Sequence, residues 1–261
     1  MIKKIYVNGC SWTDGDTMVV NGLFDKLEIK ERGKAYSYPK LLANHYNLKL
    51  DDDSRYGGSL NRITRKTWRY LQLQKNISEI IFLIEIPNGT RDEIFCVDNN
   101  DYLNITPSDL VDITDDKRKE NVYWNRHKKK IIEYYENFWD YDEFNLKQWI
   151  DFMCLILFIK QHTDNIFLIN YSHFINGKPR SPIDFEKISL SSKNFIDIIH
   201  PETGKKYDLI EHMCAEEKIS IGDILGFLDT HPNIEGHQVL FKIISDHFSR
   251  WIDKGQSKKL L

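Results

Sequence analysis

The chain has 261 residues, 13% of them aromatic, and a formal net charge of -3 at pH 7. This length supports a substantial hydrophobic core, and the acidic balance argues against a protein that binds nucleic acid non-specifically. We expect no membrane span, because no apolar run is long enough, and no secretory signal, because residues 1–4 lead directly into the first predicted strand. The four cysteines include no Cys-x-x-Cys pair, which predicts reduced thiols in the cytoplasm rather than disulfides or a zinc knuckle.

The first predicted elements are a strand, a helix and a second strand. Residues 3–8 predict the first strand, which runs directly into Gly9-Cys10-Ser11. A helix is predicted to start at Ser37-Tyr38-Pro39, because proline is favoured in the first turn of a helix. A short strand near residues 48–50 follows.

A glycine pair and the most apolar strand of the chain come next. Gly57-Gly58 ends a loop, and apolar residues at helical spacing then predict an amphipathic helix over 63–71. Residues 79–85 include an unbroken apolar run, which is typical of a central parallel strand covered on both faces. The run stops at the turn signal Pro87-Asn88-Gly89.

The region 97–145 has no clear periodicity and reads as a helical, aromatic-rich insertion. Charged clusters alternate there with tyrosines, tryptophans and phenylalanine. Such a segment inside an α/β unit is often a lid over a binding site. A peripheral helical pair that packs its aromatic residues on the core is an equally good interpretation. The basic cluster at 126–130 is short and followed by acidic residues, so it predicts a solvated helix face rather than a nucleic-acid site.

Regular patterns return after the insertion. A helix over 146–159 is apolar nearly all round and is therefore predicted to be well buried. Residues 166–170 predict another parallel strand, 207–217 look helical, and 239–252 carry the apolar stripe of a final helix packed on the sheet. This order of strands and helices predicts one doubly wound α/β domain over residues 1–261, with a mostly parallel sheet.

The candidate chemistry lies at a strand end and near the C-terminus. Ser11 follows the first strand, and ligands of open α/β folds bind at the carboxyl edge of the sheet; Gly9 permits a tight turn there. Asp229 and His231 precede Pro232 and the final helix. A hydrolytic serine needs a base and the base needs a carboxylate, and an Asp-x-His pair on one loop could supply both. In the structural alternative, Ser11 and Asp229 only cap helices.

Four segments together resemble the motif blocks of the SGNH (GDSL-type) hydrolase family. Gly9-Cys10-Ser11 is similar to the Gly-Asp-Ser block, with cysteine in place of aspartate, and Gly58-Ser59-Leu60-Asn61 resembles the second block. Ile86-Pro87-Asn88-Gly89 matches the third block, Gly-x-Asn-Asp, only loosely. Asp229-Thr230-His231-Pro232 resembles the last, although one residue rather than two separates Asp from His.

The resemblance implies a three-layer, flavodoxin-like fold and a serine esterase. Ser11 would be the nucleophile, His231 the base and Asp229 the residue that orients it. The substrate would be an acyl ester of a small molecule, a carbohydrate or a lipid, cleaved through an acyl-enzyme without a cofactor or metal.

The resemblance also implies an oxyanion hole. It would combine the backbone N–H groups of Ser11 and Gly58 with the side-chain amide of Asn88. Because the third block is degenerate, Arg91 could contribute instead, or could bind an anionic part of the substrate.

Three alternatives remain open at this point. The chain could be a non-catalytic binding or structural protein on the same fold. It could be a metal-dependent hydrolase in which Asp229, His231 and His237 bind the metal. A cysteine hydrolase that uses Cys10 is disfavoured, because neighbouring residues at a turn point in different directions.

Overall fold

The structure, a computed structural model, describes the larger part of the chain. The described residues are 2–10, 13, 35–55, 58–87, 92–96, 101–105, 129–130, 132–134, 136–137, 141–170, 174–175, 178–179, 190, 192–207, 210–220 and 231–253. Within these ranges no helix is both long enough and apolar enough to cross a lipid bilayer.

The centre of the fold is a four-stranded parallel sheet. Its strands lie in the order β2 (Lys49–Asp52), β1 (Lys4–Asn8), β3 (Ile80–Ile86) and β6 (Ile166–Asn170). β1 pairs with β2 and β3, and β3 pairs with β6, all in parallel. The predicted parallel sheet is thereby confirmed, with the apolar strand β3 in its interior. Because the strands are parallel, their carboxyl ends share one edge, where open α/β folds bind ligands.

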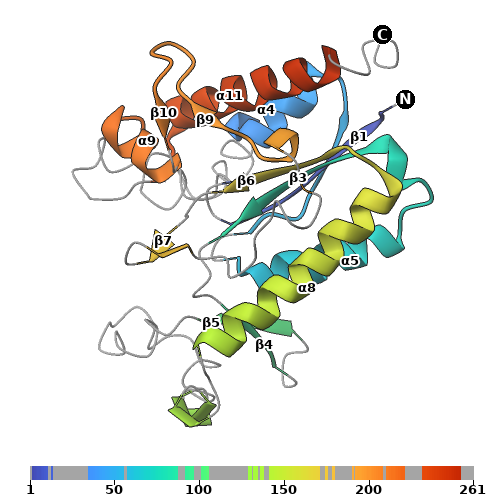
Figure 1. The fold of residues 1–261 in the computed structure, drawn as a ribbon, viewed down its shortest axis with the longest axis vertical. Helices are drawn as coiled ribbons and strands as arrows, with labels where there is room; N and C mark the ends of the chain where they lie inside the picture. Colours follow the sequence, from blue (N-terminus) through green and yellow to red (C-terminus); the bar gives the residue numbers. More distant parts are fainter. Residues whose placement is uncertain are drawn as a thin grey trace.

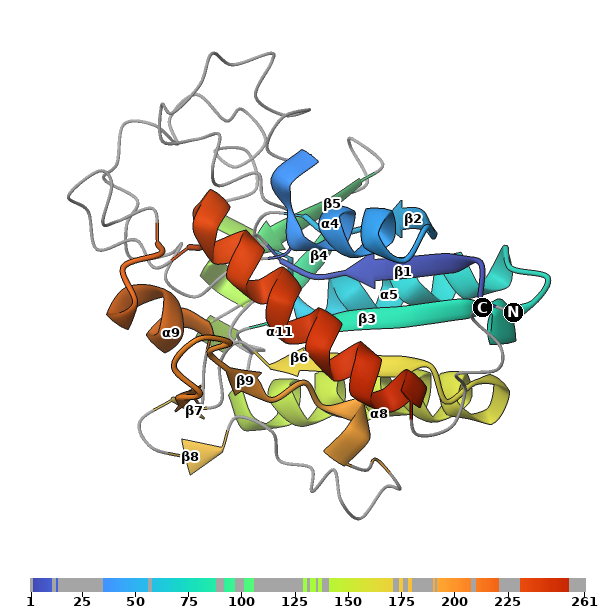
Figure 2. The ribbon, with the colours of Figure 1, turned by 90° about the horizontal axis from the view of Figure 1, so that it is seen from above.

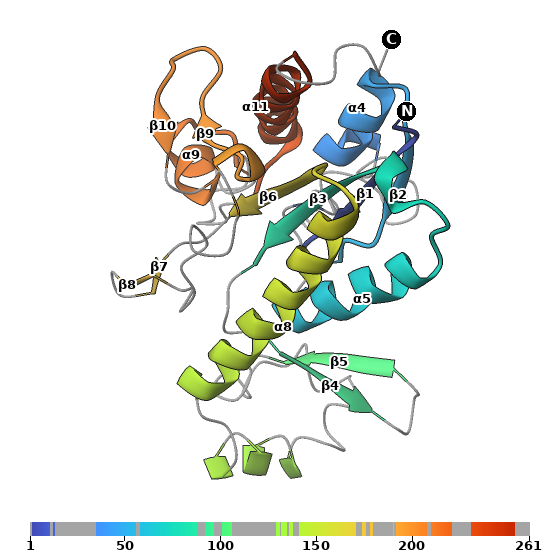
Figure 3. The same cartoon turned by 45° about the vertical axis from the view of Figure 1, so that its right-hand side comes forward.

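Helices cover both faces of this sheet (Figure 1, Figure 3). α4 (Tyr38–His45) and α11 (Ile234–Asp253) pack on one face, and α5 (Leu60–Gln72) and α8 (Tyr141–His162) pack on the other. Seen from above, α11 crosses the strands diagonally (Figure 2). The three-layer, doubly wound architecture is therefore confirmed.

Strand alternation explains why two cores form. Side chains of successive strand residues point to opposite faces of a sheet. Ile5 and Val7 of β1 accordingly belong to the core under α4 and α11, whereas Tyr6 belongs to the core under α5 and α8. All seven residues of β3 are buried, as expected for a strand covered on both sides.

The start of the predicted insertion differs from the expectation. It was predicted to be helical and aromatic from residue 97, but β4 (Asp92–Cys96) and β5 (Asp101–Ile105) form an antiparallel hairpin there. The ring of Tyr102 on β5 lies under the guanidinium of Arg65, at 3.6 Å from the ring centroid. Most of 97–145 lies outside the described residues, so the lid remains a prediction.

The predicted burial of the helix after the insertion is wrong in part. α8 is longer than 146–159, and three of its apolar side chains are substantially exposed: Leu146 at 38%, Ile150 at 48% and Leu157 at 38%. A helix in an outer layer buries only the face that it turns to the sheet. The nearly all-round apolar sequence therefore overstated how much of this helix is covered.

The remaining elements are short. They are η1 (Ile77–Glu79), β7 (Phe174–Ile175), β8 (Lys178–Pro179), η5 (Ser192–Asn194), β9 (Ile198–Ile199), β10 (Lys206–Tyr207) and α9 (Ile210–Glu216). α9 confirms the helical reading of 207–217 in its centre.

Candidate functional site

The carboxyl end of β1 turns sharply at Gly9. A Cβ atom at Gly9 would overlap the carboxylate of Glu85 and the hydroxyl of Thr13, and would lie 2.8 Å from Thr13 Cβ. Glycine is the residue without a Cβ, so this close approach explains why it occupies the position. The turn is closed by the Thr13 N–H, which donates to the carbonyl of Cys10 at 3.1 Å. Gly9, Cys10 and Thr13 therefore lie close together at the carboxyl edge of the sheet.

Gly58 lies directly against this turn. A Cβ atom at Gly58 would be 3.0 Å from the carbonyl oxygen of Gly9 and 3.5 Å from Cys10 Cα. The same carbonyl accepts a hydrogen bond of 3.1 Å from the N–H of Arg55. Two of the four motif segments, far apart in sequence, thus approach each other so closely that a side chain at position 58 would press against Gly9.

The N–H of Gly58 already has a partner. It donates to the carbonyl of Arg55 at 3.0 Å. An oxyanion at this position would have to share or displace that hydrogen bond. The role predicted for Gly58 in an oxyanion hole therefore stays a prediction, with the Arg55 carbonyl as a competing acceptor.

A buried polar cluster holds the start of α5 against the end of β1. The side-chain amide of Asn8 donates to the Ile63 carbonyl, the Tyr6 hydroxyl and Thr67 Oγ1, each at 3.0 Å. The guanidinium of Arg62 donates to Asn8 Oδ1, at 3.4 Å, and burial lowers the pKa of Arg62. Buried polar groups that are satisfied in this way fix geometry. The cluster therefore keeps Gly58, just ahead of the helix, in place.

The start of α11 is fixed around His231. Asn233 caps the helix, because its Oδ1 accepts from the Gly236 N–H at 2.8 Å. The N–H of Asn233 donates to the Ile219 carbonyl at 3.1 Å, and Pro232 forms an isolated β-bridge with Ser220. His231 is half-buried at this anchored corner. Asn233, not Asp229, is thus the residue that caps the helix.

His237 links this corner to the β1 turn through Tyr38. Its ring is fully buried and stacks on Tyr38 at 5.9 Å between centroids, and Nδ1 accepts from the Tyr38 N–H at 3.4 Å. The Tyr38 hydroxyl lies 2.9 Å from Thr13 Oγ1. Burial lowers the pKa of His237 to about 3, with a further contribution from the charge of nearby His231. The start of α11 and the turn that contains Ser11 are therefore connected by one chain of contacts.

His237 has limited capacity to bind a metal. Nδ1 is occupied by the Tyr38 N–H, and Nε2 is buried and makes no hydrogen bond within the described structure. Only Nε2 could serve as a ligand. Among the residues that the structure describes, no group of three His, Cys, Asp or Glu side chains could hold a metal ion.

Four of the predicted site residues lie outside the described residues: Ser11, Asn88, Arg91 and Asp229. Their described neighbours set the surroundings. Cys10 and Thr13 lie on either side of Ser11 in the sequence, and Pro87 follows the end of β3 at the same edge of the sheet as the end of β1.

Cys10 is not oriented as a nucleophile. Its side chain is 3% exposed and its thiol donates to the carboxylate of Glu85. A thiol that donates to a carboxylate is held as the neutral form, whereas a nucleophilic cysteine acts as the thiolate. Sequence reasoning missed Glu85 itself, although an acidic residue in an otherwise apolar buried strand was a usable signal.

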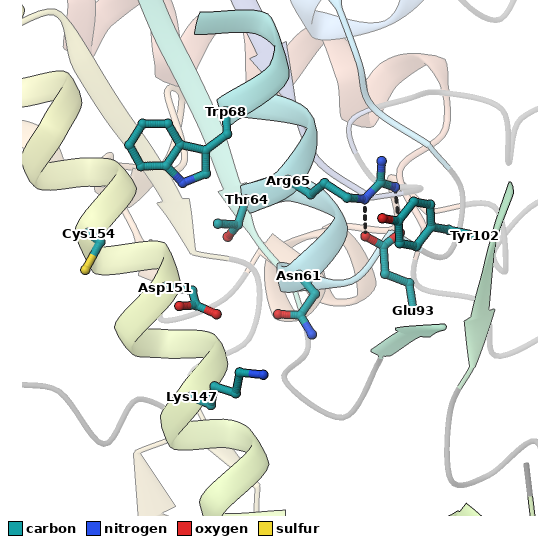
Figure 4. A pocket seen from close by; sticks show the side chains of 9 residues that line it. All are labelled: Asn61, Thr64, Arg65, Trp68, Glu93, Tyr102, Lys147, Asp151 and Cys154. Atoms are coloured by element: carbon teal, nitrogen blue, oxygen red, sulfur yellow. Dashed lines mark hydrogen bonds and ion pairs between the residues drawn. The ribbon is translucent and has the colours of Figure 1, made fainter. Parts of the chain in front are cut away.

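A polar groove begins at the first turn of α5 (Figure 4). Its volume is about 470 Å³, within the range of small-molecule sites. Side chains of α5, α8 and the β4–β5 hairpin line it: Asn61, Thr64, Arg65, Trp68, Glu93, Tyr102, Lys147, Asp151 and Cys154.

One wall of the groove is rigid and the other is open. Arg65 makes a bidentate ion pair with Glu93, at 2.7 and 2.8 Å, and the amide of Asn61 donates to Asp92 at 2.7 Å. Lys147 on α8 is exposed on the opposite side. The groove therefore presents polar and charged side chains together with apolar surface, which includes the ring of Trp68.

Comparison with known proteins gives similarity in structure only. No protein-family model matches the sequence, and no curated protein sequence matches it. The fold is similar to that of a member of the lipolytic protein G-D-S-L family from Veillonella parvula, with 10% identity, 95% of this chain and 99% of that chain covered, and a TM-score of 0.45.

Two further solved structures are similar. The psychrotrophic esterase EstA from Pseudoalteromonas sp. is 13% identical, with 96% and 99% of the two chains covered and a TM-score of 0.48. Phospholipase A1 from Streptomyces albidoflavus is 10% identical, with 95% and 100% covered and a TM-score of 0.41.

Proposed function

We propose that this protein is a serine esterase that cleaves acyl esters through a covalent acyl-enzyme. The observation that carries the proposal is the close approach of Gly58 to Gly9 and Cys10, where an added Cβ would lie only 3.0 Å from the Gly9 carbonyl oxygen. It joins two motif segments at the carboxyl edge of a parallel sheet. The Thr13–Tyr38–His237 contacts support the same site, because they bring in the start of α11, where His231 lies.

In the proposed reaction, Ser11 Oγ attacks the carbonyl carbon of the ester while His231 takes the hydroxyl proton. Asp229 orients the imidazole and stabilises the imidazolium. The tetrahedral intermediate collapses, and the alcohol leaves with the proton from His231. Water then attacks the acyl-enzyme with His231 again as base, which releases the carboxylic acid and restores Ser11.

The negative oxygen of the tetrahedral intermediate needs preorganised donors. The proposal assigns this role to the backbone N–H groups of Ser11 and Gly58 and to the amide of Asn88. The Arg55 carbonyl competes for the Gly58 N–H, so this donor would be weaker than one without a partner. Arg91 is the alternative donor or a site for a substrate anion.

A fluorophosphonate probe tests the proposal directly. We expect covalent labelling of the wild-type protein at Ser11 and hydrolysis of short acyl esters. Ser11→Ala should abolish both and leave the melting temperature nearly unchanged. Cys10→Asn, whose amide can still donate to Glu85, is the matched control and should remain labelled. If the wild-type protein is not labelled, the proposed esterase is refuted in favour of a non-catalytic protein on this fold. A large loss of melting temperature in Ser11→Ala would support a structural cap.

A further inference from the structure

Glu85 is a carboxylate buried in the central strand of the sheet. It is the only charged residue of β3, and it is 1% exposed. On the neighbouring strand its backbone is in register with Ile169 of β6. A buried carboxylate is costly unless hydrogen bonds compensate for the lost water. The partners of Glu85 therefore indicate why an acidic residue is tolerated at this position.

These partners bracket Ser11 on both sides. Glu85 Oε2 accepts the backbone N–H of Cys10 at 2.7 Å, and Oε1 accepts the thiol of Cys10. Oε2 also accepts the hydroxyl of Thr13, which in turn can accept from the Tyr38 hydroxyl at 2.9 Å. One carboxylate thus binds the residue before Ser11 and a residue two positions after it.

The same contacts constrain what can occupy position 10. The thiol of Cys10 donates to Glu85, so the side chain at this position must offer a donor. An aspartate there would bring a second carboxylate against Glu85 in a buried place, and two buried like charges repel strongly. The Gly-Cys-Ser sequence, which departs from the Gly-Asp-Ser block, is therefore matched to Glu85.

We infer that Glu85 is the positioning residue of the turn that carries Ser11, and that Cys10 is its obligatory donor partner. Glu85 touches no reacting atom in this scheme. It acts by holding Cys10 and Thr13, which lie on either side of Ser11 in the sequence, so its catalytic consequence rests on the proposed function. The coupling between Cys10 and Glu85 is independent of the proposed function.

A double-mutant cycle tests the coupling. The proteins are the wild type, Cys10→Asp, Glu85→Gln and the double variant, with Cys10→Asn as a neutral control of the same shape as aspartate. Urea unfolding should show that Cys10→Asp raises the unfolding equilibrium constant at least about 100-fold. In the Glu85→Gln background the same change should raise it less than about 10-fold, because the Gln amide can donate to the aspartate. Cys10→Asn should stay close to wild type, since its amide replaces the thiol as donor.

Kinetics test the positioning role separately. Glu85→Gln should lower kcat for a short acyl ester about 10-fold or more with KM unchanged, because a displaced nucleophile affects the chemical step rather than binding. The rate of fluorophosphonate labelling should fall by a similar factor. A Glu85→Gln protein with wild-type kcat would overturn the positioning role.

The two failures are distinguishable. Equal costs of Cys10→Asp in both backgrounds would overturn the Cys10–Glu85 coupling, whether or not the protein is an esterase. A wild-type protein that neither labels nor hydrolyses esters would refute the proposed function, and the unfolding cycle would still decide the coupling.

Discussion

His237 predicts a specific acid sensitivity of the fold. Its side chain is fully buried, and burial together with the charge of His231 lowers its pKa from 6.5 to about 3. In the unfolded chain His237 therefore binds a proton as the pH falls below 6.5, whereas in the folded chain it does so only near pH 3. Because the folded-state pKa is the lower one, the contribution of the neutral ring to stability is complete above pH 6.5 and is lost as the pH falls toward 3.

The magnitude follows from the size of the shift. Each pH unit between the two pKa values is worth about 1.4 kcal/mol of unfolding free energy. Between pH 6.5 and pH 4, His237 alone should remove about 3 kcal/mol, a large share of the stability of an ordinary domain. The contact that fixes the neutral ring is the Tyr38 N–H, which donates to Nδ1 at 3.4 Å.

The assay is urea unfolding at a series of pH values for wild type and His237→Asn. Asparagine keeps an acceptor oxygen near the place of Nδ1 but cannot take up a proton in this range. The variant should lose about 2 kcal/mol at neutral pH through the deleted ring, and it should lose less on acidification than wild type. His212→Asn, on the exposed side of α9, is the control for removing a histidine as such. If the unfolding free energy of His237→Asn falls as steeply below pH 6.5 as that of the wild type, the reasoning is refuted.

Three further predictions concern the turn, the groove and the chemistry. Gly9→Ala should lower the unfolding free energy by about 2 kcal/mol, because the new Cβ would lie 2.8 Å from Thr13 Cβ; an unchanged urea midpoint would contradict this packing. Thr64→Val should raise the unfolding free energy by about 1 kcal/mol, since the buried Thr64 hydroxyl has no partner in the described structure. A loss of stability would instead indicate that this hydroxyl makes a hydrogen bond on the side of the groove. Asn88→Ala should lower kcat about 10²–10³-fold with little change in KM if its amide binds the oxyanion. A change of only a few-fold would leave that role to other donors such as Arg91, whose change to alanine should raise KM for anionic esters and spare neutral ones.

The regular elements were predictable because their signals are local. An apolar run predicts β3, and a 3.6-residue apolar stripe predicts α11, without any knowledge of the partners. The order of these elements then leaves few topologies other than a doubly wound sheet. Local amphipathicity says which residues can be buried but not how much of a helix is covered, and this is why the burial of α8 was overestimated.

The hairpin at the start of the insertion shows the opposite case. β4 and β5 contain charged and polar residues, so no alternating pattern marks them as strands. Their environment is partly supplied by α5, where Arg65 pairs with Glu93 and covers Tyr102. Contacts with α5, about 30 residues away, stabilise this hairpin, and a periodic pattern in the sequence cannot reveal such contacts.

The sequence by itself determined where the candidate chemistry lies: Gly-x-Ser after the first strand, a glycine before α5, and Asp-x-His before α11. Only the tertiary structure decided how these segments meet. The parallel register of β1 and β3 brings Glu85 to Cys10 across 75 positions of sequence, and Tyr38 of α4 joins Thr13 to His237 of α11. Hydrogen bonds of this kind depend on the placement of whole strands and helices, because each partner is supplied by a different element. The pairing of the buried Glu85 carboxylate with the Cys10 thiol therefore could not be predicted from the sequence, because it depends on how β1 and β3 pair in the sheet.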